Sequence, residues 1–303
     1  MDTVLSLKNV TKSYENHIAV NDVSFDVPKG SIFGLLGPNG AGKTSLIRIV
    51  TTITKADRGI VELNGSSIDS NRPAQIGYMP EERGLYKKMK VGEQLMYLAR
   101  LKGMSKTDAK AAITHWLEKF EIESWWNKKI DELSKGMQQK IQFIATVVHN
   151  PPLLILDEPF SGLDPINTNL IKQEIDNIRD TGTSIIFSTH RMEQVEEICE
   201  HIVLINNGKN VLEGKVDEVK ATFKENLFKV EFKGALGSEV LNTFNVVDKK
   251  EHSVKVKLNE AESSNAVLQK FIQSGTQVVS FNEILPTLNE IFIKCVGDYN
   301  ANQ

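Results

Sequence analysis

The chain has 303 residues, of which 40% are hydrophobic, so it is long enough for one large domain or two modest ones with a real core. No apolar stretch approaches the roughly 20 residues that span a bilayer, which excludes a membrane-spanning helix in this chain. The net charge of -3 gives no overall signal of nucleic-acid binding, and we expect no nucleic acid among the partners.

The start of the chain and its two cysteines favour the cytosol. The opening residues Met1-Asp2-Thr3 lack the basic and apolar segments of a signal peptide. Cys199 and Cys295 lie far apart in apolar helical patterns and match no metal-ligand spacing, so we expect buried, reduced thiols.

The first predicted elements are strands. Val23, Phe25 and Val27 alternate with polar residues and end at a proline, which is typical of a half-buried strand in an antiparallel sheet. The apolar run at residues 31–36 has the pattern of a buried strand, and a glycine-rich segment follows it directly.

That segment has the pattern of a phosphate-binding loop. Its glycines allow backbone angles and close approaches that free the amides to face phosphates. Lys43 can reach the β- and γ-phosphates, Thr44 can offer its hydroxyl to Mg²⁺, and the helix that follows adds its positive end. An ordinary glycine-rich turn is the alternative, and the register of strand, Lys-Thr pair and helix disfavours it. The predicted nucleotide-binding residues are Gly37, Pro38, Asn39, Gly40, Ala41, Gly42, Lys43, Thr44 and Ser45.

The middle of the chain changes to helical periodicity and then returns to buried strands. Helical spacing over residues 91–127 predicts a helical insertion, placed at about 82–150. Its apolar positions are Leu95, Leu98 and Leu101 in one run and Ile113, Trp116, Leu117 and Phe120 in another. The apolar runs at 153–156 and 184–187, separated by a helix at about 167–179, are the alternation expected of a parallel sheet. The fold class is therefore α/β.

Two carboxylates follow the strand at 153–156. Asp157 and Glu158 emerge at the carboxyl end of a parallel strand, where such sheets usually bind ligands. Asp157 can hold Mg²⁺ through a coordinated water, and Glu158 can orient the attacking water and accept its proton. A capped strand end with two solvated acids is the alternative, and the phosphate-binding loop upstream weakens it.

The last part of the chain predicts a small α+β domain. Asn207-Gly208 separates two apolar runs and predicts a hairpin turn. After about residue 226, alternating strands and a helix at about 267–272 suggest a βαββαβ-like unit. Pro286 and the apolar positions after it predict a closing helix with proline in its first turn. We place the domain boundary between residues 225 and 226.

The motifs together resemble ABC-type ATPases. Leu133-Ser134-Lys135-Gly136-Met137-Gln138 precedes the strand at 153–156, as the family's signature motif does. Asp157-Glu158-Pro159, Ser161-Gly162-Leu163-Asp164 and Ser188-Thr189-His190 resemble the Walker B, D-loop and H-loop segments, in the same order. The resemblance covers roughly the first 225 residues. It implies a P-loop NTPase with a mixed sheet, an antiparallel β subdomain and the helical insertion.

The resemblance also implies ligands and roles. The ligands are ATP and Mg²⁺, the activity is ATP hydrolysis, and two nucleotide-binding domains, identical or paralogous, close head to tail on two ATP molecules. Ser134 and Gly136 would bind the γ-phosphate held by the second copy, with Asp164 near that interface. His190 would contact the γ-phosphate and Tyr14 would stack on adenine, although Tyr14 can also be read as a tyrosine on the rim of the sheet.

Two positions depart from the family pattern. Glu81 stands where the family usually has the Q-loop glutamine; it keeps an oxygen ligand for Mg²⁺ or water and adds a negative charge. Lys135 and Met137 replace the commonest signature residues, while Ser134 and Gly136 are retained, so we expect phosphate binding to survive.

By resemblance the insertion after Glu81 receives a coupling helix from a membrane permease, and Trp125 and Trp126 are either an anchor for that partner or core and rim residues. The C-terminal unit, with its ending at residues 285–292, resembles the accessory domain of bacterial ATPases that serve sodium-extrusion and drug exporters. We therefore expect an exporter subunit at the cytoplasmic face of the membrane, with a regulatory or dimer-stabilising accessory domain.

Two alternatives remain. A soluble ABC ATPase in translation or DNA maintenance usually has two nucleotide domains or a long coiled coil, and this chain has one phosphate loop and no sustained heptads. An importer ATPase would more often carry a small barrel as its accessory domain.

Overall fold

The computed structural model describes residues 2–15, 17–68, 73–82, 84–234, 243–259 and 262–301. The chain divides into two compact units: residues up to Val216 with those from Cys295 onward, and Asp217–Lys294. The first boundary of this division falls in a short helix and the second in the last helix of the chain. The domain boundary that we placed at 225/226 stays a prediction. No helix of the described residues has the length and apolar character needed to cross a membrane.

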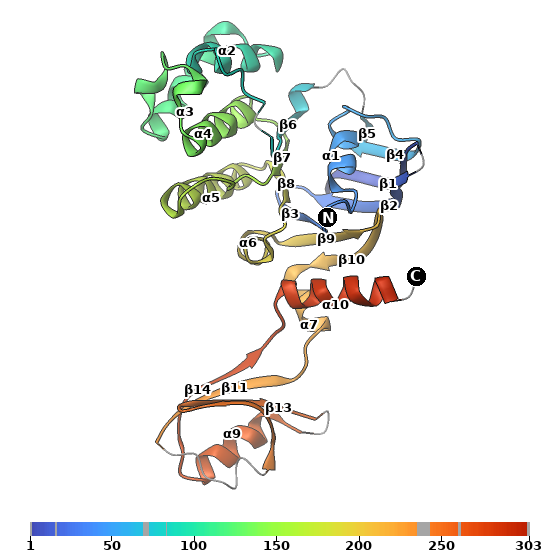
Figure 1. The fold of residues 1–303 in the computed structure, drawn as a ribbon, viewed down its shortest axis with the longest axis vertical. Helices are drawn as coiled ribbons and strands as arrows, with labels where there is room; N and C mark the ends of the chain where they lie inside the picture. The colour runs from blue at the N-terminus through green and yellow to red at the C-terminus, as the bar shows by residue number, and fades with distance from the viewer. Residues whose placement is uncertain are drawn as a thin grey trace. The chain divides into compact units, whose positions relative to one another are not determined.

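The first unit alternates strands and helices, as the sequence predicts (Figure 1). In chain order its elements are β1 (Thr3–Tyr14), β2 (His17–Pro28), β3 (Ile32–Leu36), α1 (Lys43–Val50), β4 (Arg58–Leu63), β5 (Ser66–Ser67), β6 (Ile76–Met79), α2 (Val91–Leu101), α3 (Lys106–Lys119), α4 (Lys135–Val147), β7 (Leu153–Asp157), α5 (Pro165–Asp180), β8 (Ser184–Ser188), α6 (Met192–Ile198), β9 (His201–Asn206) and β10 (Lys209–Lys215). Short 3-10 turns lie at Pro73–Gln75, Glu123–Trp125 and Ile130–Glu132.

A six-stranded mixed sheet forms the centre of this unit, in the order β10-β9-β3-β8-β7-β6. The neighbouring pairs from β9 to β6 are parallel, and β10 runs antiparallel to β9 across the predicted hairpin turn. Every residue of β3, β7 and β8 is buried, which explains their continuous apolar runs. The carboxyl ends of the parallel strands therefore open at one edge of the sheet.

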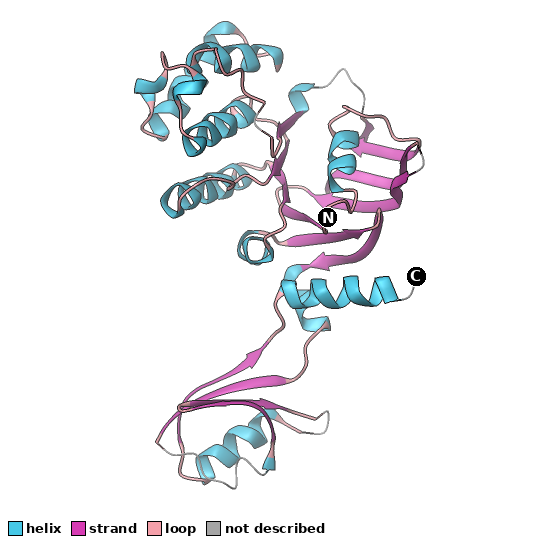
Figure 2. Cartoon of the chain, in the orientation of Figure 1, coloured by secondary structure: helices cyan, strands magenta, loops and turns pink. Residues whose placement is uncertain are grey.

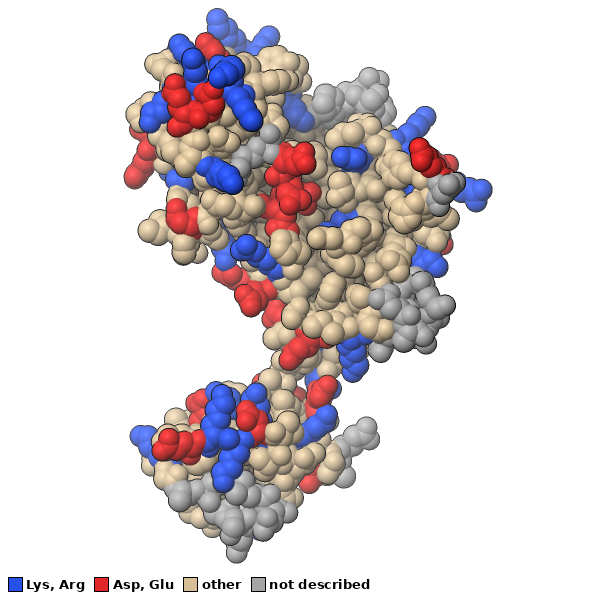
Figure 3. Space-filling view, in the orientation of Figure 1, with Lys and Arg blue, Asp and Glu red and all other residues tan. Residues whose placement is uncertain are grey.

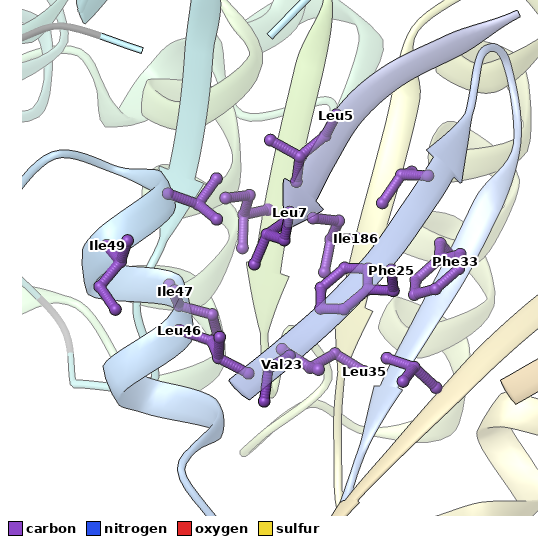
Figure 4. Close-up of a cluster of buried hydrophobic side chains, with 14 of the residues drawn as sticks. Leu5, Leu7, Val23, Phe25, Phe33, Leu35, Leu46, Ile47, Ile49 and Ile186 are labelled. Atoms are coloured by element: carbon purple, nitrogen blue, oxygen red, sulfur yellow. The ribbon is translucent and has the colours of Figure 1, made fainter. Parts of the chain in front are cut away.

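An antiparallel sheet, β2-β1-β4-β5, packs with α1 and the central sheet around one hydrophobic core. Figure 4 shows side chains of this core from β1, β2, β3, α1 and β8. Burial of α1 through Leu46, Ile47, Ile49 and Val50 fixes the helix that follows the glycine-rich loop.

The helices α2, α3 and α4 form the predicted insertion (Figure 1). Trp116 packs with Phe120 and Phe143, and Trp126 lies over Gly92, so two of the three tryptophans belong to the packing of the insertion. The run of Leu95, Leu98 and Leu101 lies in α2, as the helical pattern predicts. Val91, Leu95 and Ala99 face the interior, whereas Leu101 is 58% exposed.

The second unit has a short helix α7 (Val216–Thr222) at its start. Its strands, magenta in Figure 2, form one antiparallel sheet. The strand order is β12-β13-β11-β14. Its elements are β11 (Leu227–Lys233), β12 (Asn245–Lys250), β13 (Ser253–Lys257), α9 (Ser264–Gln273) and β14 (Gln277–Ile284). Val267 and Phe271 of α9 bury one face of the sheet. The first helix of the predicted βαββαβ pattern falls mainly on residues 235–242, outside the described residues.

Two local predictions near the C-terminus were wrong. The last helix, α10 (Leu288–Ala301), begins after Pro286. Thr287 and Glu290 explain this start, since each side chain accepts a hydrogen bond from the other's amide and so caps the helix. Cys199 is buried as expected, whereas Cys295 in α10 is only partly buried.

Candidate nucleotide-binding and catalytic site

The loop before α1 has glycines where the backbone leaves no room for a side chain. Gly37 and Gly42 have φ values of 151° and 108°, and a Cβ added there would lie 2.2 Å from the Ile205 oxygen and 2.3 Å from the Ala19 oxygen. The Gly208 amide also donates to the Ala41 oxygen at 2.9 Å. The loop is therefore held between β2 and the β9–β10 hairpin, a support that the sequence motif alone does not reveal.

Lys43 places its ammonium inside this loop. Its Nζ donates to the carbonyl oxygens of Gly37 at 2.6 Å and Pro38 at 3.1 Å. Burial lowers the pKa of Lys43, and the nearby carboxylates of Asp157, Glu158 and Glu81 oppose that shift. Thr44 and Ser45 follow in the first turn of α1, which has no side-chain cap, so its first amides can bind an anion.

Three carboxylates meet near Lys43 at the carboxyl edge of the central sheet. β6 pairs in parallel with β7, with Met79 opposite Leu156, so Glu81 leaves the sheet beside Asp157. Burial raises the pKa of Asp157, with smaller contributions from the charges of Glu81 and Glu158. Figure 3 shows acidic side chains gathered in the middle of this unit. The structure thus brings together loop 37–45, Glu81 and the Asp157-Glu158 pair.

Glu158 has a strained backbone conformation, and several groups hold its side-chain carboxylate. Its φ is 51°, in the left-handed region, which costs on the order of 1–3 kcal/mol for such a residue. The His190 amide donates to Oε1 at 2.9 Å, the His190 ring Nδ1 lies 2.6 Å from the same oxygen, and Thr189 Oγ1 donates to Oε2 at 3.1 Å. The carboxylate is therefore aimed by the segment after β8, as a general base requires.

Sequence reasoning missed two residues that hold Glu158. Thr189 lay within the recognised Ser-Thr-His segment but received no role, and its side chain is 1% exposed. Gln139 is 2% exposed, and its Nε2 donates to the Pro159 oxygen at 2.9 Å and the Glu158 oxygen at 3.4 Å. The available signal for Gln139 was a glutamine on the apolar face of the helix after the signature segment.

The signature residues lie at the start of α4. Ser134 is its N-cap and accepts from the Met137 amide at 3.3 Å, and a Cβ on Gly136 would lie 3.3 Å from the Gly162 oxygen. Among the described residues, no hydrogen bond or ion pair joins Ser134 or Gly136 to the loop at 37–45. Hydrogen bonds from Asn167 lower the pKa of Asp164, which caps α5. Ser134, Gly136 and Asp164 thus form a second group in the same chain.

Tyr14 ends β1 with a ring that is 39% exposed, and Lys12 Nζ lies 5.5 Å from the ring centroid. Its stacking on adenine stays a prediction. In the described part of the chain, no group of three or more His, Cys, Asp or Glu side chains is arranged to hold a metal ion by itself.

Comparison with known proteins identifies the family. A family model described as ABC transporter matches residues 20–161, and one described as ATP-binding protein DrrA1-3-like, C-terminal domain, matches residues 214–296. The chain is 43% identical to the uncharacterized ABC transporter ATP-binding protein YhaQ of Bacillus subtilis (strain 168), over 97% of this chain and 99% of that protein.

Two further matches agree. The chain is 33% identical to the Nod factor export ATP-binding protein I of Cupriavidus metallidurans, over 72% of this chain and 73% of that protein. A solved structure of an ATP binding subunit of an ABC transporter has a TM-score of 0.69 and 29% identity, over 73% of this chain and 93% of that one. The predicted P-loop NTPase fold is confirmed. The chain belongs to the family of ABC transporter ATP-binding proteins, which are ATPases that bind and hydrolyse ATP.

Proposed function

We propose that this ATPase is a subunit of an exporter. ATP closes it against a second copy or a paralogous subunit, and hydrolysis resets the pair while a separate transmembrane permease moves the substrate. A solved bacterial ABC transporter cassette that shares this fold is described as dimeric, which supports the pairing. The observation that carries the proposal is an exposed apolar surface on the insertion, next to the loop that holds Glu81.

This apolar surface surrounds a groove of about 190 Å³. Leu85, Leu98 and Leu101 line the groove, together with Pro80, the residue before Glu81. Tyr86 and Tyr97 pack edge to face beside it, with 54% and 44% of their surfaces exposed. Apolar side chains left this exposed on a helix are typical of a docking site for another protein. We assign the groove to a short helix of the permease.

The ATP site is proposed to form between two chains. Loop 37–45, Asp157, Glu158 and His190 of one chain would surround the triphosphate, and Ser134 and Gly136 of the other would close on its γ-phosphate. The separation of the two groups within one chain supports this reading, because neither group is complete alone. Pairing and ATP binding are then linked, since each completes the other's contacts.

The oxygen donors in the site suit Mg²⁺. Thr44, Glu81 and Asp157 would hold the ion, with the nucleotide phosphates supplying further ligands, as is usual for Mg²⁺ at nucleotide sites. The gathering of Glu81, Asp157 and Glu158 near Lys43 supports a divalent cation there. Bound Mg²⁺ neutralises charge on the phosphates. Lys43 would bind the phosphates, and Glu158 would accept a proton.

The direction of transport is proposed to be outward. One relative is named an export ATP-binding protein, and the model that matches residues 214–296 describes a C-terminal domain of DrrA1-3-like ATP-binding proteins. We assign residues 226–303 to an accessory domain that regulates or stabilises the pair. The permease would hold the ATPase at the cytoplasmic face of the membrane.

Copurification tests the proposal. The chain is expressed with the membrane protein of roughly six apolar spans that we expect in an adjacent reading frame, and the complex is isolated from detergent-solubilised membranes. We expect Leu101→Asp and Tyr97→Asp to abolish copurification while ATPase activity of the isolated subunit persists. The control, Ile272→Asp, changes an aliphatic side chain that is 61% exposed on α9. Recovery of the wild-type chain with ribosomes or DNA instead would contradict the proposal.

A further inference from the structure

Helix α4 carries two buried glutamines that hold the two loops of the carboxylates. Gln139 and Gln142 lie three residues apart on the buried face of α4 and are 2% and 4% exposed. Gln142 Nε2 donates to the Pro80 oxygen at 2.7 Å, and Gln139 Nε2 donates to the Pro159 oxygen at 2.9 Å. Each glutamine therefore binds the carbonyl of a proline that adjoins a site carboxylate, Glu81 or Glu158.

These hydrogen bonds restrict the one soft torsion of each proline. The ring fixes φ of a proline, and the peptide plane is rigid, so only ψ remains free to redirect the chain after it. A donor that fixes the carbonyl oxygen also fixes ψ. Because Pro80 follows β6 directly, Gln142 determines the direction in which Glu81 leaves the sheet.

Gln139 acts on the other loop, where the proline follows the carboxylate residue, and there it also binds the carbonyl of that residue itself. Glu158 has a left-handed φ of 51°, and its own carbonyl accepts from the Ser161 amide at 3.1 Å in the turn toward the D-loop. Gln139 donates to the carbonyls of the two successive peptides that flank Pro159, those of Glu158 at 3.4 Å and of Pro159 at 2.9 Å. The strained conformation that aims Glu158 is thus fixed from α4 as well as from the segment after β8.

Stability of the fold does not explain Gln142. Within the described residues its Oε1 is buried without a hydrogen-bond partner, which is a cost to the fold. A methionine has a similar length and would fill the same space without that cost. What the glutamine adds is the Nε2 donor that binds the Pro80 carbonyl oxygen.

The same helix begins with the signature residues. Ser134 caps α4, and Gly136 lies against the Gly162 oxygen. In the proposed two-chain site, α4 would start at the γ-phosphate held by the second chain, while its glutamines bind both carboxylate loops of its own chain. The helix would then link the two ATP sites physically.

We propose that Gln139 and Gln142 are positioning residues that tie the signature helix to Glu158 and Glu81, so that closure on one ATP molecule aligns the carboxylates around the other. This inference rests on the proposed two-chain site. Helix α4 would then be the element that couples the two ATP sites.

Turnover of the full chain provides the first test. We expect Gln139→Met and Gln142→Met each to lower kcat about 10-fold, the scale of a small misplacement of a catalytic group, with KM for ATP within about twofold. Thr146→Val is the matched control, because it removes a buried hydrogen bond within α4, from Thr146 Oγ1 to the Gln142 carbonyl, and keeps the side-chain donors of both glutamines. Equal losses in all three variants, or none in the methionine variants, would overturn the inference.

Binding provides a second test that does not depend on turnover. Calorimetry with ATP, with and without Mg²⁺, measures the gain in affinity that the ion brings. We expect Gln142→Met and Glu81→Gln each to reduce that gain, and the double variant to match Glu81→Gln alone. Additive losses would show that Gln142 acts apart from Glu81. The proposed two-chain site would be refuted by a different result: a wild-type chain that does not dimerise when ATP is added and whose hydrolysis does not depend on Ser134. Failure of the two-chain site can thus be distinguished from failure of the inference about the glutamines.

Discussion

At the scale of single residues, Glu158 combines a strained backbone conformation with a carboxylate whose two oxygens both accept hydrogen bonds. Donors from Thr189 and His190 reach its two oxygens, and the side chain is 13% exposed. A carboxamide at this position keeps the size of the side chain but cannot accept a proton. A substitution of Glu158 by glutamine therefore tests ATP hydrolysis separately from ATP binding.

We expect Glu158→Gln to lower ATP hydrolysis by about 100-fold or more, the usual scale for loss of a general base, while ATP affinity stays close to that of the wild type. Steady-state hydrolysis and nucleotide titration measure the two effects. Glu193→Gln, at an exposed carboxylate in the first turn of α6, serves as the control. Unchanged turnover in Glu158→Gln would refute the role of this residue.

At the scale of secondary-structure elements, two helical glycines have opposite surroundings. A Cβ on Gly92 in α2 would lie 2.3 Å from Trp126 Cε2, whereas a Cβ on Gly297 in α10 would meet nothing within 4 Å. Alanine is the better helix former at both positions. Packing should reverse that preference at Gly92, because the indole that covers it cannot move without disturbing the insertion.

We expect Gly92→Ala to destabilise the protein by about 1–3 kcal/mol through overpacking. Gly297→Ala should stabilise it by about 0.5–1 kcal/mol through helix propensity. Urea unfolding monitored by circular dichroism compares the two variants. If both changes shift stability in the same direction, the close packing of Trp126 on Gly92 is wrong.

The secondary-structure elements also show which parts of the fold can be predicted from the sequence. β3, β7 and β8 were predictable because burial on both faces leaves an unbroken apolar run. The exposure of Leu101 was not predictable, because the sequence alone does not distinguish an apolar residue that faces solvent from one that faces the core. The contact of Gln142 with Pro80 was also hidden, since it joins residues 62 positions apart through one side-chain donor.

At the scale of the whole molecule, the proposed site makes a prediction that no single chain can satisfy. Lys43 and Ser134 would act on the same ATP only when they belong to different chains. Lys43→Ala should disable the phosphate loop of its own chain. Ser134→Asp should keep the cap of α4, since aspartate is a good N-cap, and repel the γ-phosphate of the other chain.

Mixing these two variants should restore hydrolysis although each is inactive alone. In a mixed pair, one site receives both substitutions and the other receives neither. With random pairing, half of the pairs are mixed and each has one of two sites intact, so about a quarter of the wild-type rate is the most that should return, and the proposed coupling of the two sites through α4 would lower it further. The rate, measured against mixing ratio, should peak at equal amounts. Mixing either variant with the Lys43→Ala/Ser134→Asp double variant leaves no intact site and should restore nothing. A flat profile in the first mixture would mean that each chain completes its own site.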